Sequence, residues 1–304
     1  MRIHHLINDI YETLKQPGWF TPEAREEFSS SLAQRLEYEM KERTEKPTLR
    51  LSQMGPKCPR ALWYSIHHPE LAVELNPWTK NTFAYGHIVE VLALTQAKLA
   101  GHEVTGEQDA VTLDGVTGHR DCIIDGSLCD VKSCGKYLFR KFKDKTISET
   151  VVRNGCEVPG ANGDLFGYLD QLDGYVTASV GDPLLRNTDT AYILAVDKQL
   201  GHMCLYEHRI REERIRSCIK SYKSIVEADT PPECTCGTEP FGASGNRKLD
   251  TQASYSVYRH CCWPELRTFI YKDEDGPRPV YLTKVVRTPN VLEVDSHGQP
   301  VNIR

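Results

Sequence analysis

The chain has 304 residues, of which 39% are hydrophobic, which is enough for one large α/β domain or for a core domain with an added segment. No stretch reaches the roughly 20 consecutive apolar residues of a membrane-spanning helix, and acidic and polar residues stand near the N-terminus where a signal peptide would be apolar, so we expect a cytoplasmic protein with no membrane contact. The formal net charge of -5 excludes a polycation that coats nucleic acid, so any DNA contact must come from a local patch.

Hydrophobic periodicity and turn residues divide the chain into helices and strands. The predicted elements, in chain order, are two helices within 4–45 with a break at Pro17-Gly18, a short helix from Pro59, a helix over 83–100 that ends before Gly101, strands at 102–113, 117–124 and 127–133, a helix over 162–179, strands at 191–196 and 203–208, and a helix that ends near Ala228. This order predicts an α/β fold with a central mixed β-sheet flanked by helices.

Three segments follow from this pattern. Residues 1–55 form an N-terminal helical addition, and residues 56–230 form the core. Residues 231–304 begin at Pro231-Pro232 and form a C-terminal cysteine-bearing segment, which we expect to pack on the core.

The stretch from Arg120 to Lys132 carries the chemistry. Asp125-Gly126 stands between two short apolar runs and predicts a two-residue hairpin turn, which would place Asp121 directly opposite Asp130. Two carboxylates at about 5 Å repel each other, and a divalent cation such as Mg²⁺ would compensate them. Lys132 would project from the same face as Asp130, because side chains alternate along a strand.

Two acids and an ammonium at one point match the needs of phosphodiester hydrolysis. A metal would polarise the phosphoryl group and acidify a water, while a lysine would position or deprotonate that water. The alternative is a surface hairpin whose acids and lysine form a solvated salt-bridge cluster. The opposition of Asp121 and Asp130 favours the catalytic interpretation.

Four motifs in this order resemble those of the PD-(D/E)XK nucleases. Asp121, followed by the hairpin to Asp130-Val131-Lys132, resembles their second and third motifs, and the helix with Gly86-His87-Ile88-Val89-Glu90 resembles the first. Gln171-Leu172-Asp173-Gly174-Tyr175 is similar to the Gln-x-x-x-Tyr signature of the RecB-like and lambda-exonuclease-like branch.

The resemblance implies a restriction-endonuclease-like core that uses Mg²⁺ or Mn²⁺ to hydrolyse DNA. Lys132 would be the catalytic lysine, and the metal ligands would be Glu90, Asp121, Asp130 and the carbonyl of Val131. Many RecB-like members carry His where Glu90 stands, so this chain follows an acidic variant. Gln171 and Tyr175, one helical turn apart, would orient the DNA end.

The same resemblance favours an exonuclease in DNA end processing or recombination, in the manner of small phage or CRISPR-associated enzymes. It leaves room for a single-strand annealing or recombination protein as a partner, for an oligomer, and for the host cytoplasm as location if a phage encodes the chain. A structure- or sequence-specific endonuclease with the same chemistry is an alternative. So are a non-catalytic DNA-binding or recombination module and a cysteine-rich metal protein.

A basic segment follows the hairpin. Between Lys132 and Lys145 there are six cationic residues and one acid, interleaved with aromatic residues, and this composition suits contact with phosphates and bases. Lys136, Arg140 and Lys141 are the candidate DNA contacts. A solvated loop with some buried aromatic residues is the alternative.

Eleven cysteines are spread through the chain and are expected to be thiols or metal ligands rather than disulfides. The segment from Lys57 to Tyr64, which contains Cys58, resembles the first-cysteine motif of RecB-like nucleases with an iron-sulfur cluster. The chain departs from that family's later spacing, because Ser256 and Ala253 stand where two ligands are expected.

Two explanations remain open for this departure. Cys234 and Cys236 replace the missing pair and bind iron-sulfur or zinc together with Cys58 and with Cys261 or Cys262, or the cluster is lost. The remaining cysteines are expected to be buried small hydrophobes: Cys122, Cys129, Cys134, Cys156, Cys204 and Cys218.

Overall fold

The computed structural model describes residues 2–40, 46–75, 77–147, 150–153, 156–159, 163–273, 276–296 and 298–301. The chain forms two compact units. Unit 1 contains Met1–Glu45, Leu49–Pro56 and Pro77–Lys220, and unit 2 contains Lys46–Thr48, Lys57–Asn76 and Ser221–Arg304. The division into segments 1–55, 56–230 and 231–304 stays a prediction. Within the described ranges, no helix is both long and apolar enough to cross a membrane.

A five-stranded mixed sheet lies at the centre of unit 1. Its strands, in spatial order, are β1 (Val104–Thr105), β4 (Cys122–Ile124), β5 (Ser127–Cys134), β8 (Asn187–Asp197) and β9 (Met203–Arg209). The pair β5 and β8 is parallel and the other neighbours are antiparallel. Two short hairpins join β2 (Ala110–Leu113) to β3 (Val116–His119) and β6 (Thr150–Arg153) to β7 (Cys156–Pro159).

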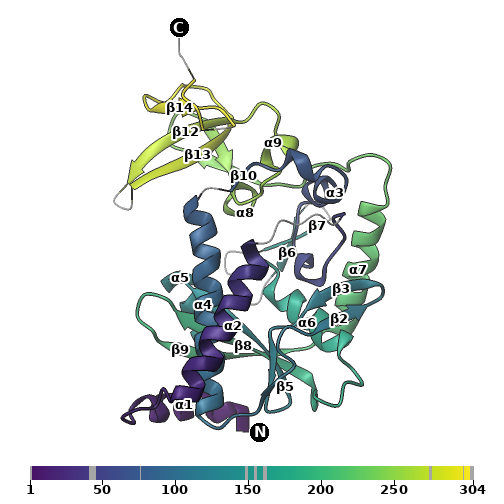
Figure 1. The fold of residues 1–304 in the computed structure, drawn as a ribbon. Coiled ribbons are helices and arrows are strands. Elements are labelled where there is room, and N and C mark those ends of the chain that lie inside the picture. Colours follow the sequence, from purple (N-terminus) through teal and green to yellow (C-terminus); the bar gives the residue numbers. More distant parts are fainter. Residues whose placement is uncertain are drawn as a thin grey trace. The chain divides into compact units, whose positions relative to one another are not determined.

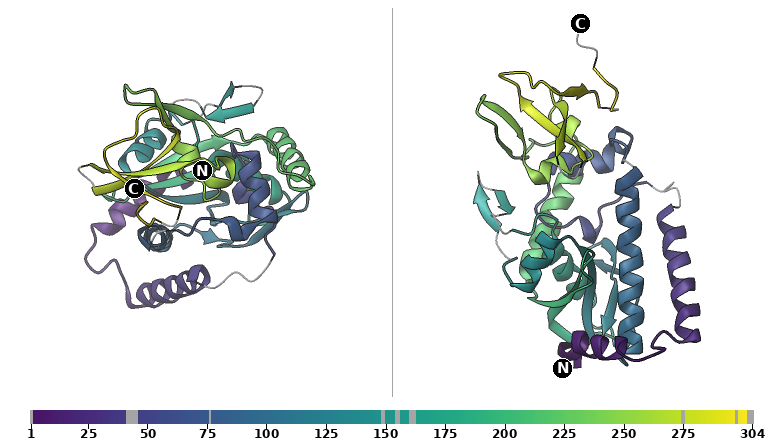
Figure 2. Two further views of the ribbon diagram at one scale, coloured as in Figure 1. Left: turned by 90° about the horizontal axis from the view of Figure 1, so that it is seen from above. Right: turned by 90° about the vertical axis from the view of Figure 1, so that its left-hand side faces the viewer.

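Helices cover both faces of this sheet. The 3-10 helix η1 (Arg2–His5), α1 (Leu6–Leu14) and α4 (Pro77–Leu99) pack on one face, and α5 (Lys136–Lys143) and α6 (Tyr168–Ala178) contact strands β5, β8 and β9. Helix α2 (Pro22–Met40) lies beside α4 in Figure 1 and in the right-hand view of Figure 2. The predicted α/β class, with a central mixed sheet flanked by helices, is confirmed.

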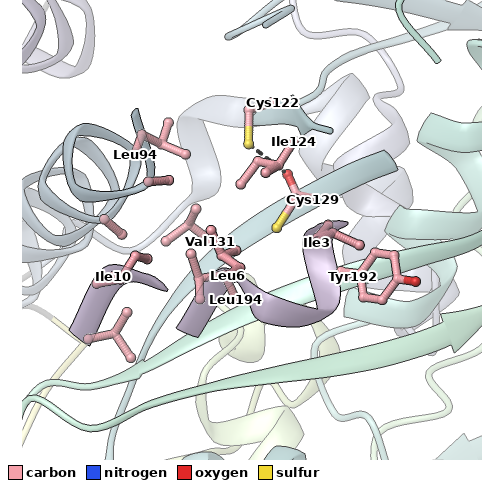
Figure 3. Packing of buried hydrophobic residues seen from close by; sticks show 13 residues of the cluster. Ile3, Leu6, Ile10, Leu94, Cys122, Ile124, Cys129, Val131, Tyr192 and Leu194 are labelled. Carbon is pink, nitrogen blue, oxygen red and sulfur yellow. Dashed lines mark hydrogen bonds between the residues drawn. The ribbon is translucent and has the colours of Figure 1, made fainter. Parts of the chain in front are cut away.

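The apolar core of unit 1 lies between the N-terminal helices and the sheet (Figure 3). Ile3, Leu6 and Ile10 are fully buried against residues of β4, β5 and β8. The sheet side of this cluster includes Cys122, Ile124, Cys129, Val131, Tyr192 and Leu194. Burying this apolar surface stabilises the sheet that carries the candidate site.

Several predicted element bounds were wrong. Helix α4 begins at Pro77, six residues before the predicted start, because proline is well tolerated at a first helical position. The strand predicted at 102–113 is divided into β1 and β2, since Gly106 and Gln108 both adopt positive φ. Helix α6 begins only at Tyr168, after Gly167 at φ +77°.

Unit 2 has its own antiparallel sheet, for which no strands were predicted. The sheet order is β10 (Thr238–Phe241), β11 (Asn246–Leu249), β13 (Gly276–Lys284), β12 (Arg267–Asp273) and β14 (Leu292–Val294). Its apolar cluster has three buried members, Phe269, Val280 and Leu282. Short helices accompany the sheet: α3 (Pro59–His67), η3 (Pro69–Leu71), α8 (Thr251–Ser254) and α9 (Arg259–Cys262). The remaining elements are η2 (Leu51–Gln53) in unit 1 and α7 (Glu212–Val226), which spans the boundary at Lys220.

Candidate active site

The hairpin turn between β4 and β5 sets the position of the candidate acids. Asp125 and Gly126 adopt φ of 51° and 79°, and positive φ at both central residues is the mark of a type I′ turn. A Cβ at residue 126 would lie 2.4 Å from Arg186 Nε and would displace that side chain, and the positive φ strains any residue other than glycine. The strand pairs Ile124 with Ser127, Ile123 with Leu128 and Cys122 with Cys129, which confirms the predicted register.

The alternation of β5 separates core side chains from candidate catalytic ones. Cys129 and Val131 point into the apolar cluster shown in Figure 3. Asp130 and Lys132 therefore project from the opposite face of the sheet. On that face Lys132 Nζ lies 5.3 Å from the centre of the Tyr168 ring, at the start of α6.

Asp121 does not form the predicted strand pair with Asp130. Strand β4 begins at Cys122, one residue after Asp121. The carbonyl of Asp121 instead accepts a hydrogen bond from the Gln108 amide at 3.1 Å, so the Asp121 backbone pairs with the loop before β2. Its side chain nevertheless reaches β5, where Oδ2 accepts a hydrogen bond from the Val131 amide at 3.0 Å. The two acids remain neighbours through a side-chain contact instead of a backbone pair.

Asp130 is almost completely buried, with 2% of its side chain exposed. Its Oδ2 lies 2.6 Å from Lys132 Nζ, whereas its Oδ1 is buried and accepts no hydrogen bond from any described residue. Burial and the nearby Asp121 carboxylate raise the pKa of Asp130 well above its ordinary value. A buried carboxylate oxygen without a donor is costly unless a cation or a proton satisfies it.

Lys132 is the cationic partner in this cluster. Burial opposes its charge, but the carboxylates of Asp130 and Asp121 outweigh that effect and raise the pKa of Lys132. Lys132 is therefore an ammonium ion in the metal-free protein.

Glu90 interacts with an arginine side chain and with a glutamine side-chain amide. Its Oε1 pairs with the guanidinium of Arg35 from α2 and accepts a hydrogen bond from Gln108 Nε2 at 3.0 Å. Gln108 Nε2 also lies 3.5 Å from Asp121 Oδ1, so it bridges the two acids. His87 Nδ1 is 3.9 Å from Glu90 Oε2. Neither Arg35 nor Gln108 was predicted from the sequence, and no motif marks either residue.

The predicted pair on α6 is in contact, since Gln171 Nε2 donates to Tyr175 Oη at 3.0 Å. Tyr175 is 2% exposed, and a Cβ at Gly118 would lie 2.7 Å from its ring. Burial, with the charge of Asp130, raises the pKa of Tyr175. Asp173, on the same helix, accepts hydrogen bonds from Arg211 and lies 2.7 Å from His208 Nε2, which fixes α6 in place.

The basic segment forms helix α5 rather than a loop. Lys136 and Arg140 are exposed as predicted. Lys141, however, is 6% exposed and its ammonium lies 4.7 Å from the centre of the Tyr137 ring, so this residue was wrongly predicted as part of an open patch. The reason is the helical spacing, which places Phe139 and Phe142 on the buried face of α5. Lys141, which is adjacent to Phe142, is buried with them.

Four cysteines of unit 2 come together. Cys58 precedes α3, Cys234 and Cys236 stand in the loop before β10, and Cys262 ends α9. Their sulfur atoms all lie within 4.8 Å of one another. Of the two candidates for the last position, Cys262 belongs to this group, while Cys261 is only half-buried and outside it.

The expectation of buried, inert cysteines holds only in part. Cys122, Cys129 and Cys134 are buried, whereas Cys204 and Cys218 are half-buried. Cys204 differs because β9 is an edge strand, and Cys218 because it lies on the partly open face of α7. The side chain of Cys156 lies outside the described residues.

The acidic cluster has the chemistry of a magnesium site. Mg²⁺ prefers one or two protein carboxylates and completes its shell with waters and substrate phosphates, so it needs no full protein cage. Asp130 Oδ1 is the oxygen left for such an ion, and Asp121 and Glu90 are the neighbouring acids. The residues therefore fit a divalent cation, and the carbonyl of Val131 remains a predicted further ligand.

Comparisons with known proteins give few matches. No family model matches the chain, and no curated protein matches it. A crystal structure of a protein designated SSO0001 is similar at 12% identity and a TM-score of 0.37, over 80% of this chain and 97% of that one. An alkaline exonuclease (LHK-Exo) from Laribacter hongkongensis is similar at 14% identity and a TM-score of 0.38, over 67% of this chain and 93% of that one. At such TM-scores neither likeness carries weight, and the site must be judged by its own geometry.

Proposed function

We propose that this chain is a Mg²⁺- or Mn²⁺-dependent DNA nuclease, and more specifically an exonuclease. The observation that carries the proposal is the buried Asp130, whose Oδ1 accepts no hydrogen bond from the described residues and whose Oδ2 is held by Lys132. A solvated salt bridge, the alternative considered from the sequence, requires an exposed pair, and this carboxylate is 2% exposed.

Each acid has a definite part in the proposed site. Asp130 and Asp121 would hold the cation, with Glu90 as a third acidic ligand and the Val131 carbonyl completing the set. The bound metal would supply a Lewis acid for the phosphoryl group and a more acidic water. Because Glu90 is paired with Arg35 in the metal-free protein, it would have to exchange that partner in order to bind the ion.

Lys132 would act through its charge. Since its pKa is raised, it is protonated at neutral pH and suits the stabilisation of charge that develops on the phosphoryl oxygens. A role as the base would require that the metal first neutralise Asp130 and Asp121.

The remaining roles concern the position of DNA. Lys136 and Arg140 on the exposed face of α5 would contact phosphates. The half-buried Gln171 donates to the buried Tyr175 and, by the resemblance, this pair would align a DNA end. The preference for ends, a setting in recombination and an annealing partner all rest on that resemblance.

The test is cleavage of end-labelled linear DNA and closed circular DNA by the wild type and by Asp130→Asn, with Mg²⁺, Mn²⁺ or EDTA. Metal-dependent loss of linear DNA alone, absent in the variant, supports the exonuclease. Cutting of circles would replace it with an endonuclease that has the same chemistry. DNA binding without cleavage under any condition would leave a non-catalytic module.

A further inference from the structure

We infer that the four cysteines of unit 2 bind one tetrahedral zinc ion that holds this unit together, and not an iron-sulfur cluster. The inference is independent of the nuclease activity. It concerns Cys58, Cys234, Cys236 and Cys262, all of which belong to unit 2.

The spacing of the sulfur atoms decides between the two kinds of centre. Cys58 Sγ lies 3.8 Å from Cys234 Sγ and 3.8 Å from Cys262 Sγ, and all four sulfur atoms lie within 4.8 Å of one another. Zinc–sulfur bonds of about 2.3 Å directed to the corners of a tetrahedron place the sulfur atoms about 3.8 Å apart. The observed spacing is that of four ligands around a single ion.

An iron-sulfur cluster does not fit this spacing. Its cysteines bind different iron atoms, so the width of the cluster adds to the separation of their sulfur atoms. Four thiols that all lie within 4.8 Å leave no room for several irons and bridging sulfides. The iron-sulfur centre implied by the resemblance to RecB-like nucleases therefore disagrees with the geometry of this chain.

Hydrogen bonds around the thiols hold the loop that carries Cys234 and Cys236. Arg60 Nε donates to the carbonyl of Pro232 at 2.7 Å, and Trp63 Nε1 donates to that of Ala228 at 2.8 Å, so α3 is tied to the chain before Cys234. On the other side of the pair, the Asp250 amide donates to the carbonyl of Gly237 at 3.1 Å. The loop with Cys234 and Cys236 is thus fixed at both ends.

Unit 2 gains most from such an ion. The apolar cluster of its sheet is small, with Phe269, Val280 and Leu282 as its buried members among the described residues, and small units are often stabilised by a metal or a disulfide. Cys58 and Cys262 are 204 residues apart in the chain, and linking distant positions restricts the unfolded ensemble strongly. Four thiolates leave no open coordination position, which is typical of structural zinc and not of catalytic zinc.

The test is the metal content of the full-length protein, purified without a metal-affinity tag. Mass spectrometry of the metals should find about one zinc per chain, with no acid-labile sulfide. Replacement by Co²⁺ should give the visible absorption bands of tetrahedral cobalt thiolate. Cys236→Ala should lower the zinc content to less than about a tenth of wild type, whereas Cys261→Ala, at the neighbouring cysteine outside the group, should retain all of it.

A second measurement covers a variant that does not fold. Wild-type protein treated with a mercurial thiol reagent should release its zinc to a colorimetric chelator, and the release should be complete once the four ligand thiols have reacted. If the purified protein contains iron together with acid-labile sulfide, it binds an iron-sulfur cluster and the inference is overturned. If it contains iron without sulfide, the site binds a single iron ion and the choice of zinc is overturned. Absence of metal both as purified and after reduction and addition of Zn²⁺ or Co²⁺ would overturn the site itself.

Discussion

The acidic site of unit 1 and the cysteine site of unit 2 both gather side chains that attract metals, but they hold them in opposite ways. The four thiols lie around one point, whereas each acid has its own partner: Lys132 for Asp130, Arg35 for Glu90 and the Val131 amide for Asp121. Among the described residues, the thiols are the one group of three or more such side chains gathered this closely.

An ion would have a different role in each unit. The acids stand on a sheet that packs on a large apolar cluster, so in the proposed nuclease a cation there would serve catalysis and not the fold. The thiols stand on loops and at the end of α9, and a zinc ion there would be part of the fold. Loss of the first ion should stop catalysis, and loss of the second should unfold a unit.

The largest expected effect is that of Asp130→Asn on cleavage. The loss should exceed about a hundredfold, the upper range for an outer partner of a metal ligand. The variant should also be at least as stable as wild type in Mg²⁺-free buffer, because it removes a buried carboxylate with an unsatisfied oxygen. Steady-state cleavage and thermal unfolding measure the two. If the variant unfolds, Asp130 has a structural role and not a catalytic one.

Lys132→Met should follow in size. We expect kcat to fall about 10² to 10³-fold, as for loss of one group that stabilises developing charge, with little change in DNA affinity. Single-turnover rates and equilibrium binding separate the two quantities. An equal loss in both would make Lys132 a phosphate contact only.

The stability of the metal-free protein and its affinity for Mg²⁺ should both depend on pH. The pKa of Asp130 is raised, so the folded metal-free protein keeps a proton that the unfolded chain, at a pKa of about 3.9, has lost. The free energy of unfolding should therefore fall as the pH rises from about 4 through the raised pKa. Mg²⁺ needs the carboxylate, so its apparent affinity should rise about tenfold per pH unit over the same range. Calorimetric Mg²⁺ titrations at several pH values test this, and Asp130→Asn should show no such slope.

The smallest effect concerns α5. Replacing Lys136 and Arg140 with alanine should weaken DNA binding and lower the salt slope by about two, one for each phosphate contact. Lys15→Ala is the matched control, because this exposed lysine follows α1, on the face of the sheet opposite α5. An unchanged slope in the double variant would remove α5 from the DNA-binding surface.

Local sequence signals predicted the centre of unit 1 well. Asp125-Gly126 was sufficient to place the β4–β5 turn and three residue pairs, because this turn needs positive φ at both positions. The place of Asp121 could not be predicted in the same way, since it depends on a hydrogen bond from Gln108 across a loop.

The other features that the sequence did not predict depend on contacts between residues far apart in the chain. Arg35 reaches Glu90 from a helix 55 residues earlier, and no pattern in either helix records that contact. In unit 2, strand β11 pairs with β13 across a long sequence distance, for example Arg247 with Lys284, and no local signal predicts that pairing. The choice of Cys262 over Cys261 depends on the end of α9, which a sequence pattern does not fix.

The two-residue turn at Asp125-Gly126 also limits how this protein can diversify. The positive φ at residue 126 strains any side chain there, and side chains along a strand alternate between faces. Insertion of one residue that shifted β5 against its neighbours would turn the Asp130 position toward the apolar cluster and Val131 toward the acids. Homologues are therefore expected to vary loop length elsewhere and to preserve the length of this turn, because it sets the face of the sheet on which Asp130 lies.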